Sequence, residues 1–211
     1  MHPEAKAFTL FVKQQLATAF QSKRVLDVGS GDINGNNRFL FEDCEYHGND
    51  VVAAKNVTIV CKTADLPLEE NSFDTIISTE CFEHDPQYKE SLQKIYSLLK
   101  PDGLLCFTCA STGRKEHGTR RTTPHDSYGT IGGVEDMSDY YYNLTIQDVN
   151  SALALDSLFS VWDAYYHTSA NDLYFVGIKK GTSTPNAFSN YCDKDRRVLR
   201  TTNHVLSTET P

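Results

Sequence analysis

The chain has 211 residues, a formal net charge of −8 and a hydrophobic content of 39%. This length allows one α/β domain with a buried core, and the acidic balance argues against nucleic acid or an anionic membrane surface as a partner, because both attract clustered positive charge. No apolar run approaches the roughly 18 residues of a membrane span, and the first residues lack the apolar stretch of a signal peptide. We therefore expect a cytoplasmic protein.

The first predicted elements are a helix and a buried strand. Apolar side chains recur at spacings of three and four over residues 3–20, which predicts an amphipathic helix that lies either over a ligand cleft or against the sheet. The apolar run around Asp27 then predicts a parallel strand. This strand enters a tight turn at Gly29 and Gly31, where glycine lets the backbone approach a ligand closely.

Asp27 indicates which ligand this glycine turn suits. A dinucleotide pyrophosphate is anionic and usually meets backbone N–H groups at a helix N-terminus, so Asp27 and Asp32 would repel it. The sulfonium and ammonium groups of S-adenosylmethionine (SAM) would instead be attracted. The glycine spacing G-x-G-x-x-x-G also differs from the dinucleotide fingerprint G-x-G-x-x-G. The turn therefore favours a cationic ligand.

A helical stretch and three strands follow, near residues 36–43, 46–50, 57–62 and 75–79. Only six residues separate Asp50 from Val57, whereas a parallel crossover normally needs about a dozen. We expect an irregular turn there in place of a helix.

Strand and helix then alternate. Residues 86–99 predict a helix that ends at the turn signal Lys-Pro-Asp-Gly, and residues 104–110 predict the next strand. This order predicts a doubly wound, mostly parallel sheet, whose ligands bind beyond the carboxyl ends of its strands.

The second half begins with a long polar stretch, residues 111–143, which we expect to be a functional loop. Thr145 and Asp148 form a capping-box pattern at the start of a helix. Strands over residues 160–167 and 173–179 predict an antiparallel hairpin that closes the sheet. We expect the domain to span residues 1–181, with an extended tail over 182–211.

No metal or disulfide is expected. The six cysteines are scattered, and Cys106 and Cys109 would point to opposite faces of one strand, so reduced thiols are the better interpretation. The run Glu83-His84-Asp85 is too compact for a magnesium site without further ligands.

Four segments in this order resemble the motifs of class I SAM-dependent methyltransferases. They are Val25–Gly31, Asp50, Ala64–Asp74 and Glu80–His84, within a resemblance that covers about residues 20–180. The resemblance implies a SAM cofactor, methyl transfer, and a seven-stranded, mostly parallel sheet whose last strand is antiparallel.

The resemblance also implies which residues contact SAM. Asp27 and the backbone of Gly29, Ser30 and Gly31 would hold the methionine part, with Asp27 favouring the ammonium group. Asp50 would accept hydrogen bonds from both ribose hydroxyls, a task that suits an acceptor-only carboxylate. Further contacts are implied for Val51, Ala64, Asp65, Leu66, Thr79 and Glu80. Asp65 would take the adenine amino hydrogen unless it merely forms a turn, and Val51 and Leu66 would sandwich the ring.

The sequence also contains candidate general bases for activating the methyl acceptor. The methyl group of SAM is already activated, so alignment and exclusion of water matter most, but a hydroxyl acceptor also benefits from a general base. His117 is the preferred candidate and His84 the second, with Asp85 and His125 behind them. Either of the first two histidines could instead be structural.

Basic and aromatic side chains of the long loop are candidates for binding the acceptor, because they combine charge, stacking and hydrogen bonding. They are Arg114, Arg120, Arg121, His125, Tyr128 and Tyr140. Alternatively, the arginines form surface ion pairs with Glu116, Asp126, Glu135 and Asp136.

The segments 108–119 and 140–145 resemble methyltransferase domains that modify glycans, one of which ends a multidomain glycosyltransferase of large algal viruses (chloroviruses) and acts on rhamnose. This resemblance implies O-methylation of a sugar hydroxyl, a place within a larger glycosyltransferase chain, and the host cytoplasm as location. Two alternatives stay open: a small-molecule N- or carboxyl-methyltransferase, and a SAM-binding module without catalysis.

Overall fold

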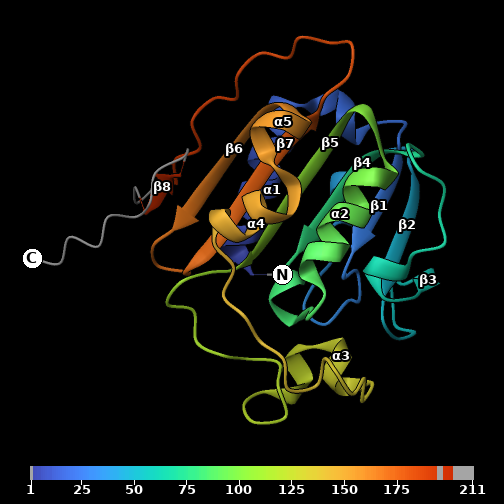
Figure 1. The fold of residues 1–211 in the computed structure, drawn as a ribbon, viewed down its shortest axis with the longest axis vertical. Helices are drawn as coiled ribbons and strands as arrows, with labels where there is room; N and C mark the ends of the chain where they lie inside the picture. The colour runs from blue at the N-terminus through green and yellow to red at the C-terminus, as the bar shows by residue number, and fades with distance from the viewer. Residues whose placement is uncertain (1, 194–196, 202–211) are drawn as a thin grey trace, which may run out of the picture.

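The structure, a computed structural model, describes residues 2–193 and 197–201, which contain one sheet in the order β3-β2-β1-β4-β5-β7-β6-β8 (Figure 1). Its strands are β1 Arg24–Val28, β2 Glu45–Asp50, β3 Ile59–Val60, β4 Phe73–Thr79, β5 Leu99–Ala110, β6 Phe159–His167, β7 Asp172–Lys179 and β8 Val198–Arg200. Neighbours among β1 to β5 pair in parallel, whereas β7 is antiparallel to β5 and β6. The predicted sheet is confirmed, and β8 adds an edge strand antiparallel to β6 that the sequence did not predict.

Among the described residues, the α-helices are fewer than the strands. The α-helices are α1 Pro3–Gln15, α2 Tyr88–Leu98, α3 Tyr128–Ile131, α4 Ile146–Leu153 and α5 Leu155–Leu158. The 3₁₀ turns are η1 Ala17–Phe20, η2 Arg38–Leu40, η3 Thr63–Asp65, η4 Phe82–His84 and η5 Pro124–Asp126. The predicted helix over residues 3–20 is thus α1 followed by a 3₁₀ turn. Among the described residues, no helix is long and apolar enough to cross a membrane.

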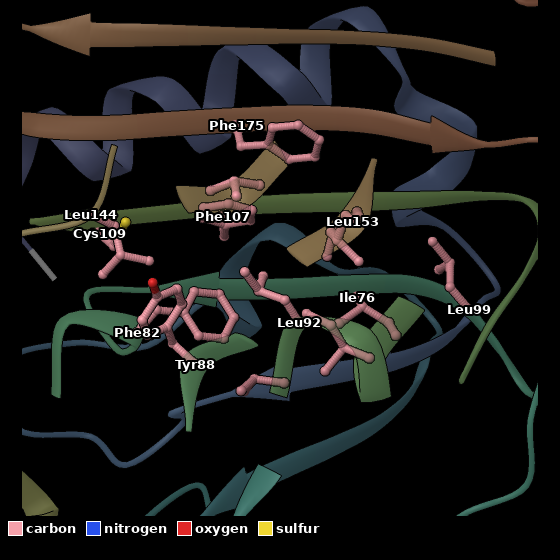
Figure 2. Packing of buried hydrophobic residues seen from close by; sticks show 14 of the residues in the cluster. Ile76, Phe82, Tyr88, Leu92, Leu99, Phe107, Cys109, Leu144, Leu153 and Phe175 are labelled. Carbon is pink, nitrogen blue, oxygen red and sulfur yellow. The ribbon is translucent and has the colours of Figure 1, made fainter. Parts of the chain in front are cut away.

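The sheet carries a core layer on each face. On one face, Leu92 of α2 and Leu153 of α4 pack against Phe107 and Phe175 of the sheet (Figure 2). On the other face, α1 covers the sheet, and its Phe8 stacks on Tyr174 with ring centroids 4.8 Å apart. Cys106 and Cys109 belong to different layers, and all six thiols are free, as predicted from strand geometry.

The connection from β1 to β2 contains no α-helix, although a doubly wound sheet normally has one there. Residues 36–43, predicted as helical, form only the 3₁₀ turn η2. Phe8 of α1 and Phe20 of η1 pack in the same core cluster as Val25 and Leu40, so the N-terminal segment fills the layer that a crossover helix would occupy. The glycine turn is therefore not followed by a helix N-terminus.

The connection from β2 to β3 is the irregular turn that its length predicts. The Asn49 side chain donates to the carbonyls of Ile59 (3.2 Å) and Cys61 (2.8 Å), which holds the short β3 against β2. A Cβ added to Gly48 would lie 2.0 Å from the carbonyl oxygen of Asn56, so the turn packs directly onto the strand. This packing fixes Asp50 at the carboxyl end of β2.

Residues 183–193, which follow Gly181, form no helix or strand and pack on the α1 face. Phe188 and Tyr191 are buried in the α1 core layer, and the Tyr191 ring lies edge-on to Phe8 with centroids 5.3 Å apart. The Asp102 carboxylate accepts the backbone N–H groups of Thr182 and Ser183. The end of the predicted tail, residues 202–211, lies outside the described residues.

Candidate active site

A cavity of about 430 Å³ lies at the carboxyl ends of β1, β2 and β4. This volume falls in the range of small-molecule sites. The long loop, which contains α3, lies beyond these strand ends and supplies the outer wall (Figure 1). The N-terminal His2 lines the cavity as well, so three separate parts of the chain enclose it.

The two glycines of the turn after β1 are needed because other side chains press against them. Gly29 has a φ of +70°, and a Cβ there would lie 2.5 Å from the Cys81 side chain. A Cβ on Gly31 would lie 2.2 Å from the Tyr128 ring and 2.8 Å from the Asp50 carboxylate. No α-helix follows this turn, so a pyrophosphate would lack the helix N-terminus that usually binds it.

Gly29→Ala should destabilise the protein by more than a change at a glycine with free space around it. The left-handed conformation costs an alanine roughly 1–2 kcal/mol, and the clash with Cys81 adds about 1–3 kcal/mol. Gly133→Ala is the matched control, since Gly133 has a φ of +64° but no atom within 4 Å of an added Cβ. Chemical unfolding should give the larger loss for Gly29→Ala; equal losses would show that Cys81 exerts no steric constraint.

Asp27 is a buried carboxylate at the cavity wall. It accepts hydrogen bonds from the Asn37 amide (3.0 Å) and the Tyr46 hydroxyl, yet burial raises its pKa to about 6. The Asn37 amide nitrogen also donates to the Thr79 hydroxyl (3.2 Å), which leaves the buried Asn37 Oδ1 without a partner. Since Asn37 lines the cavity, this oxygen and the charge of Asp27 together suit an ammonium group.

Asn37 was missed at the sequence level. It belongs to no recognisable motif, and the only signal was its place shortly after the glycine turn. Its importance depends on the distant Thr79, which only the folded sheet brings near.

SAM affinity should fall as the pH falls through about 6, because protonation of Asp27 removes the negative charge that attracts the ammonium group. One linked proton changes the dissociation constant by at most about tenfold per pH unit. Burial also raises the pKa of Asp50, so the Asp27→Asn variant is compared with Asp50→Asn. Calorimetric titrations between pH 5 and 8 should show a flatter pH dependence of SAM affinity in Asp27→Asn. An unchanged dependence would show that Asp27 does not attract the ammonium group.

Asp50 stands at the end of β2 with both carboxylate oxygens oriented. One oxygen accepts the backbone N–H of Gly31 (3.0 Å) and the other accepts that of Val51 (2.8 Å). Each oxygen keeps a lone pair for a further donor. The carboxylate is thereby held in position to accept a hydroxyl pair from a ribose.

Most of the other implied cofactor residues also reach the cavity. Ser30, Val51, Thr79 and Glu80 line it, and Glu80 has a left-handed φ of +55°. The Glu80 carboxylate accepts the Thr108 hydroxyl (2.7 Å) and pairs with His2 (3.2 Å). His2 is therefore a second cavity residue that the sequence did not reveal.

The segment Ala64–Leu66 does not lie where the resemblance to methyltransferases implies. Ala64, Asp65 and Leu66 do not line the cavity, because the turn η3 directs Leu66 into the core and leaves Asp65 exposed. Leu66 is 1% exposed and cannot sandwich an adenine ring. Lys62 and Thr63, just before these residues, line the cavity in their place.

The two candidate bases lie together at one wall of the cavity. The rings of His84 and His117 are 5.0 Å apart and nearly perpendicular, although 32 residues separate them in the chain. Burial lowers the pKa of His84 to about 3, so its imidazole is neutral at physiological pH. His117 is partly exposed, and its Nδ1 lies 3.1 Å from the Lys115 carbonyl oxygen.

Asp85 lines the cavity, but its carboxylate oxygens already accept hydrogen bonds from within the protein. Its carboxylate accepts the Ser91 hydroxyl (2.5 Å) and the Gln87 backbone N–H (2.8 Å). These bonds hold the start of α2, so Asp85 has little freedom to act as a base.

The structure divides the predicted acceptor-binding residues into two groups. Arg114 and Tyr128 line the cavity, and Arg114 is held there by Asp172 (3.1 Å). The others lie outside the lining: Arg120, Arg121, His125 and Tyr140.

The alternative of surface ion pairs is confirmed only for Arg121 with Glu116, because Asp139 was not among the expected partners. Arg120 pairs with Asp139, and Arg121 pairs with Glu116 and Asp139. His125 is 77% exposed and lies 3.6 Å from Asp126. These side chains therefore interact with acidic neighbours and do not reach an acceptor in the cavity.

The end of the long loop is fixed by the predicted capping box. The Thr145 backbone N–H donates to the Asp148 carboxylate (2.8 Å), and the Thr145 hydroxyl accepts the Asp148 backbone N–H (3.4 Å). Such a cap contributes on the order of 1 kcal/mol. It anchors the cavity's outer wall to the start of α4.

Comparison with known proteins gives a consistent classification. Residues 26–107 match the family model of a methyltransferase domain, and no curated protein matches the chain. A Haemonchus contortus phosphoethanolamine N-methyltransferase 2 in complex with SAM has a TM-score of 0.58 at 16% identity over 83% of this chain. This chain spans only 53% of that protein.

A Burkholderia thailandensis 1,6-didemethyltoxoflavin-N1-methyltransferase, with its substrate and S-adenosylhomocysteine bound, is similar as well. Its TM-score is 0.56 at 16% identity, over 84% of this chain and 80% of that one. At such identities the structures support the fold, while the domain match covers the glycine turn, Asp50 and the following strands. Residues 26–107 thus match a methyltransferase domain, and the chain shares the fold of these solved methyltransferase structures.

Proposed function

We propose that this protein transfers the methyl group of SAM to a hydroxyl of a carbohydrate, with rhamnose as the first candidate. The observation that carries the proposal is the position of His84 and His117, whose rings lie 5.0 Å apart in the same cavity as Asp27 and Asp50. A hydroxyl acceptor needs such groups beside it because it must lose a proton to become a good nucleophile.

The donor side of the cavity fits SAM. Asp27 and Asn37 Oδ1 suit the ammonium group, Asp50 suits the ribose hydroxyls, and the glycine turn allows close approach of the methionine part. Acidic groups at this edge also favour the positive sulfonium over an anionic nucleotide. SAM supplies a methyl group that is already activated for transfer.

The acceptor side suits a polar, uncharged molecule. Arg114 and His117 line it with hydrogen-bonding groups that suit sugar hydroxyls, whereas the Tyr128 ring packs against Gly31 on the donor side. In the reaction, the acceptor oxygen forms a bond to the methyl carbon while the carbon–sulfur bond breaks. S-adenosylhomocysteine leaves as a neutral thioether, and the hydroxyl proton passes toward the histidine wall, which is formed by His84 and His117.

An amine acceptor is the second candidate, because Glu116 and Asp126 also line the cavity and would attract a cation. Both named neighbours are N-methyltransferases. An ammonium group loses its proton far more readily than a sugar hydroxyl does, and the neutral amine is already a good nucleophile, so the two histidines would matter less for it.

Methyl transfer from labelled SAM to a panel of acceptors tests the proposal. The panel contains rhamnosides, other glycosides and small amines, and products are identified by mass spectrometry. We expect labelled methyl ethers of a glycoside, with rhamnosides preferred. Label found only in the amines would overturn the proposed acceptor class while leaving the methyltransferase assignment intact.

A further inference from the structure

Three side chains at the histidine wall converge in a way that methyl transfer alone does not explain. One ligand atom each from Glu83, His84 and His117 lies within 4.8 Å of the others. Glu83 and His84 come from the single turn η4, and His117 comes from the long loop. Gly118, with a φ of +69°, allows this approach, since a Cβ there would lie 2.6 Å from the His84 ring.

The polar atoms of this cluster lack partners. Glu83 is 0% exposed, and its carboxylate oxygens have no side-chain hydrogen-bond partner; burial raises its pKa, and only the backbone N–H groups of Glu83 and Ala110 favour its charged form. The Nδ1 atom of the buried His84 has no hydrogen-bond partner either. Native proteins rarely leave such groups unsatisfied, so this arrangement indicates a missing ligand.

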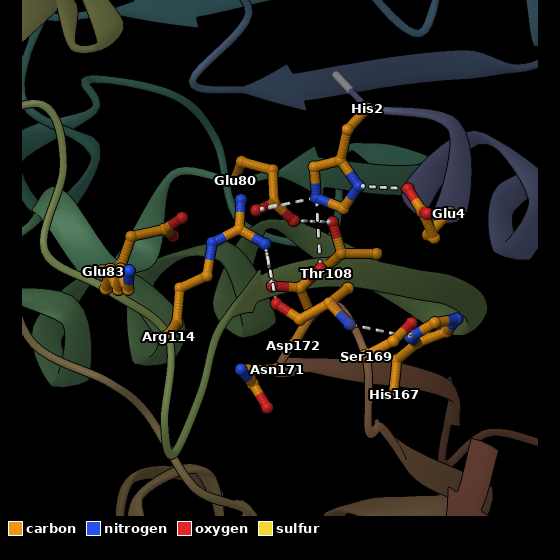
Figure 3. Close-up of polar contacts among 12 residues, drawn as sticks. His2, Glu4, Glu80, Glu83, Thr108, Arg114, His167, Ser169, Asn171 and Asp172 are labelled. Carbon is orange, nitrogen blue, oxygen red and sulfur yellow. Dashed lines mark hydrogen bonds and ion pairs between the residues drawn. The ribbon is translucent and has the colours of Figure 1, made fainter. Parts of the chain in front are cut away.

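The positive charges nearby are already engaged elsewhere. His2 lies 3.2 Å from Glu80 and 3.1 Å from Asp172, and Arg114 lies 3.1 Å from Asp172. Figure 3 shows these pairs as one connected group, with Glu83 at its side and not joined to it. Apart from His117, whose Nε2 is 4.0 Å away, the structure gives Glu83 no ion-pair partner among the described residues.

We propose that Glu83, His84 and His117 bind a divalent transition-metal ion. Two imidazole nitrogens and one carboxylate oxygen suit Zn²⁺, Mn²⁺, Fe²⁺ or Co²⁺ better than Mg²⁺ or Ca²⁺, which prefer oxygen ligands. Three protein ligands leave further coordination positions open. The expectation of no metal considered only Glu83-His84-Asp85, because the sequence alone could not place His117 beside them.

The position gives the ion a role that rests on the proposed function. His84 and His117 line the cavity where the acceptor binds, so an ion held between them would contact the acceptor hydroxyl. As a Lewis acid it would favour loss of the hydroxyl proton to solvent water. The two histidines would then act through the ion and not take the proton themselves.

Titration of the metal-free full chain with Co²⁺ tests the site. Visible absorption reports coordination by nitrogen ligands, and elemental analysis after desalting gives the stoichiometry. We expect one equivalent of Co²⁺ per chain, and binding weakened at least about tenfold in Glu83→Gln and in His117→Ala. His125→Ala is the matched control, because this histidine is 77% exposed and outside the cluster, and it should bind Co²⁺ as the unchanged protein does.

His2→Ala separates this cluster from the neighbouring group of His2, Glu80 and Asp172. Retained binding in His2→Ala supports the site at Glu83. Loss of binding in His2→Ala alone, or failure of the unchanged protein to bind Co²⁺, would overturn it. SAM calorimetry on the same samples keeps the two proposals distinct: metal-free protein that binds SAM and methylates a glycoside at full rate would refute the ion's role in the reaction and retain the proposed function.

Discussion

Asp50→Ala is expected to weaken SAM binding by at least about tenfold. A hydrogen bond to a charged group is worth roughly 1.5–3 kcal/mol, and the carboxylate has a free lone pair on each oxygen for the ribose hydroxyls. The substitution also removes the acceptor for the Gly31 N–H, which holds the glycine turn. Isothermal calorimetry with SAM measures the effect, and circular dichroism confirms that the variant is folded.

Asp65→Ala is the matched control for this experiment. Both aspartates belong to the motifs that resemble the methyltransferase family, but Asp65 is exposed and does not line the cavity. We expect its loss to leave SAM affinity within about twofold, below the effect of a lost charged hydrogen bond. Unchanged affinity in Asp50→Ala, or a large loss in Asp65→Ala, would show that the ribose and adenine positions are misassigned.

His117→Ala should lower kcat by about 100-fold or more and leave SAM affinity nearly unchanged. Groups that handle a proton in the transition state typically contribute factors of 10²–10⁴, and His117 lies on the loop wall, away from the carboxylates of the donor side. The effect is expected whether the imidazole contacts the hydroxyl directly or through a metal ion. Single-turnover kinetics with a glycoside acceptor, together with SAM calorimetry, separates chemistry from binding.

His125→Ala is the control for the kinetic experiment, because His125 belongs to the same loop but is 77% exposed. Its kcat should stay within about twofold of that of the unchanged protein, as for surface substitutions away from a site. If His117→Ala keeps its full kcat, His117 takes no part in the reaction and the proposed hydroxyl acceptor loses its preferred base.

Features set by local chemistry could be predicted from the sequence. The strand before Gly29, the placement of Asp50 at a strand end and the cap at Thr145 each depend on residues close together in the chain. The antiparallel hairpin of β6 and β7 follows in the same way from alternating residues and a short turn. For these elements the neighbouring residues decide the structure.

Features set by distant contacts could not be predicted. Hydrogen bonds to Asp27 and Thr79 place Asn37 at the cavity. Ion pairs with Glu80 and Asp172 place His2 there. The missing crossover helix depends on α1 filling the layer in its place. Such arrangements need the packed sheet, because no local pattern records them.

Leu66 shows how a motif can mislead. The resemblance implies that it contacts adenine, but η3 is short and turns its side chain into the core. The motif's place along the chain was informative, since Lys62 and Thr63 beside it do line the cavity. Which side chain faces the ligand was decided by the local turn.

We expect the acidic strand ends around the glycine turn to bind a cationic methyl donor. Calorimetry with SAM and with NAD, on the same preparation at pH 7.5, measures this preference. We expect saturable one-to-one binding of SAM and no measurable heat with NAD, because Asp27 repels a pyrophosphate and the turn lacks a following helix. Binding of NAD, or of neither molecule, would contradict it.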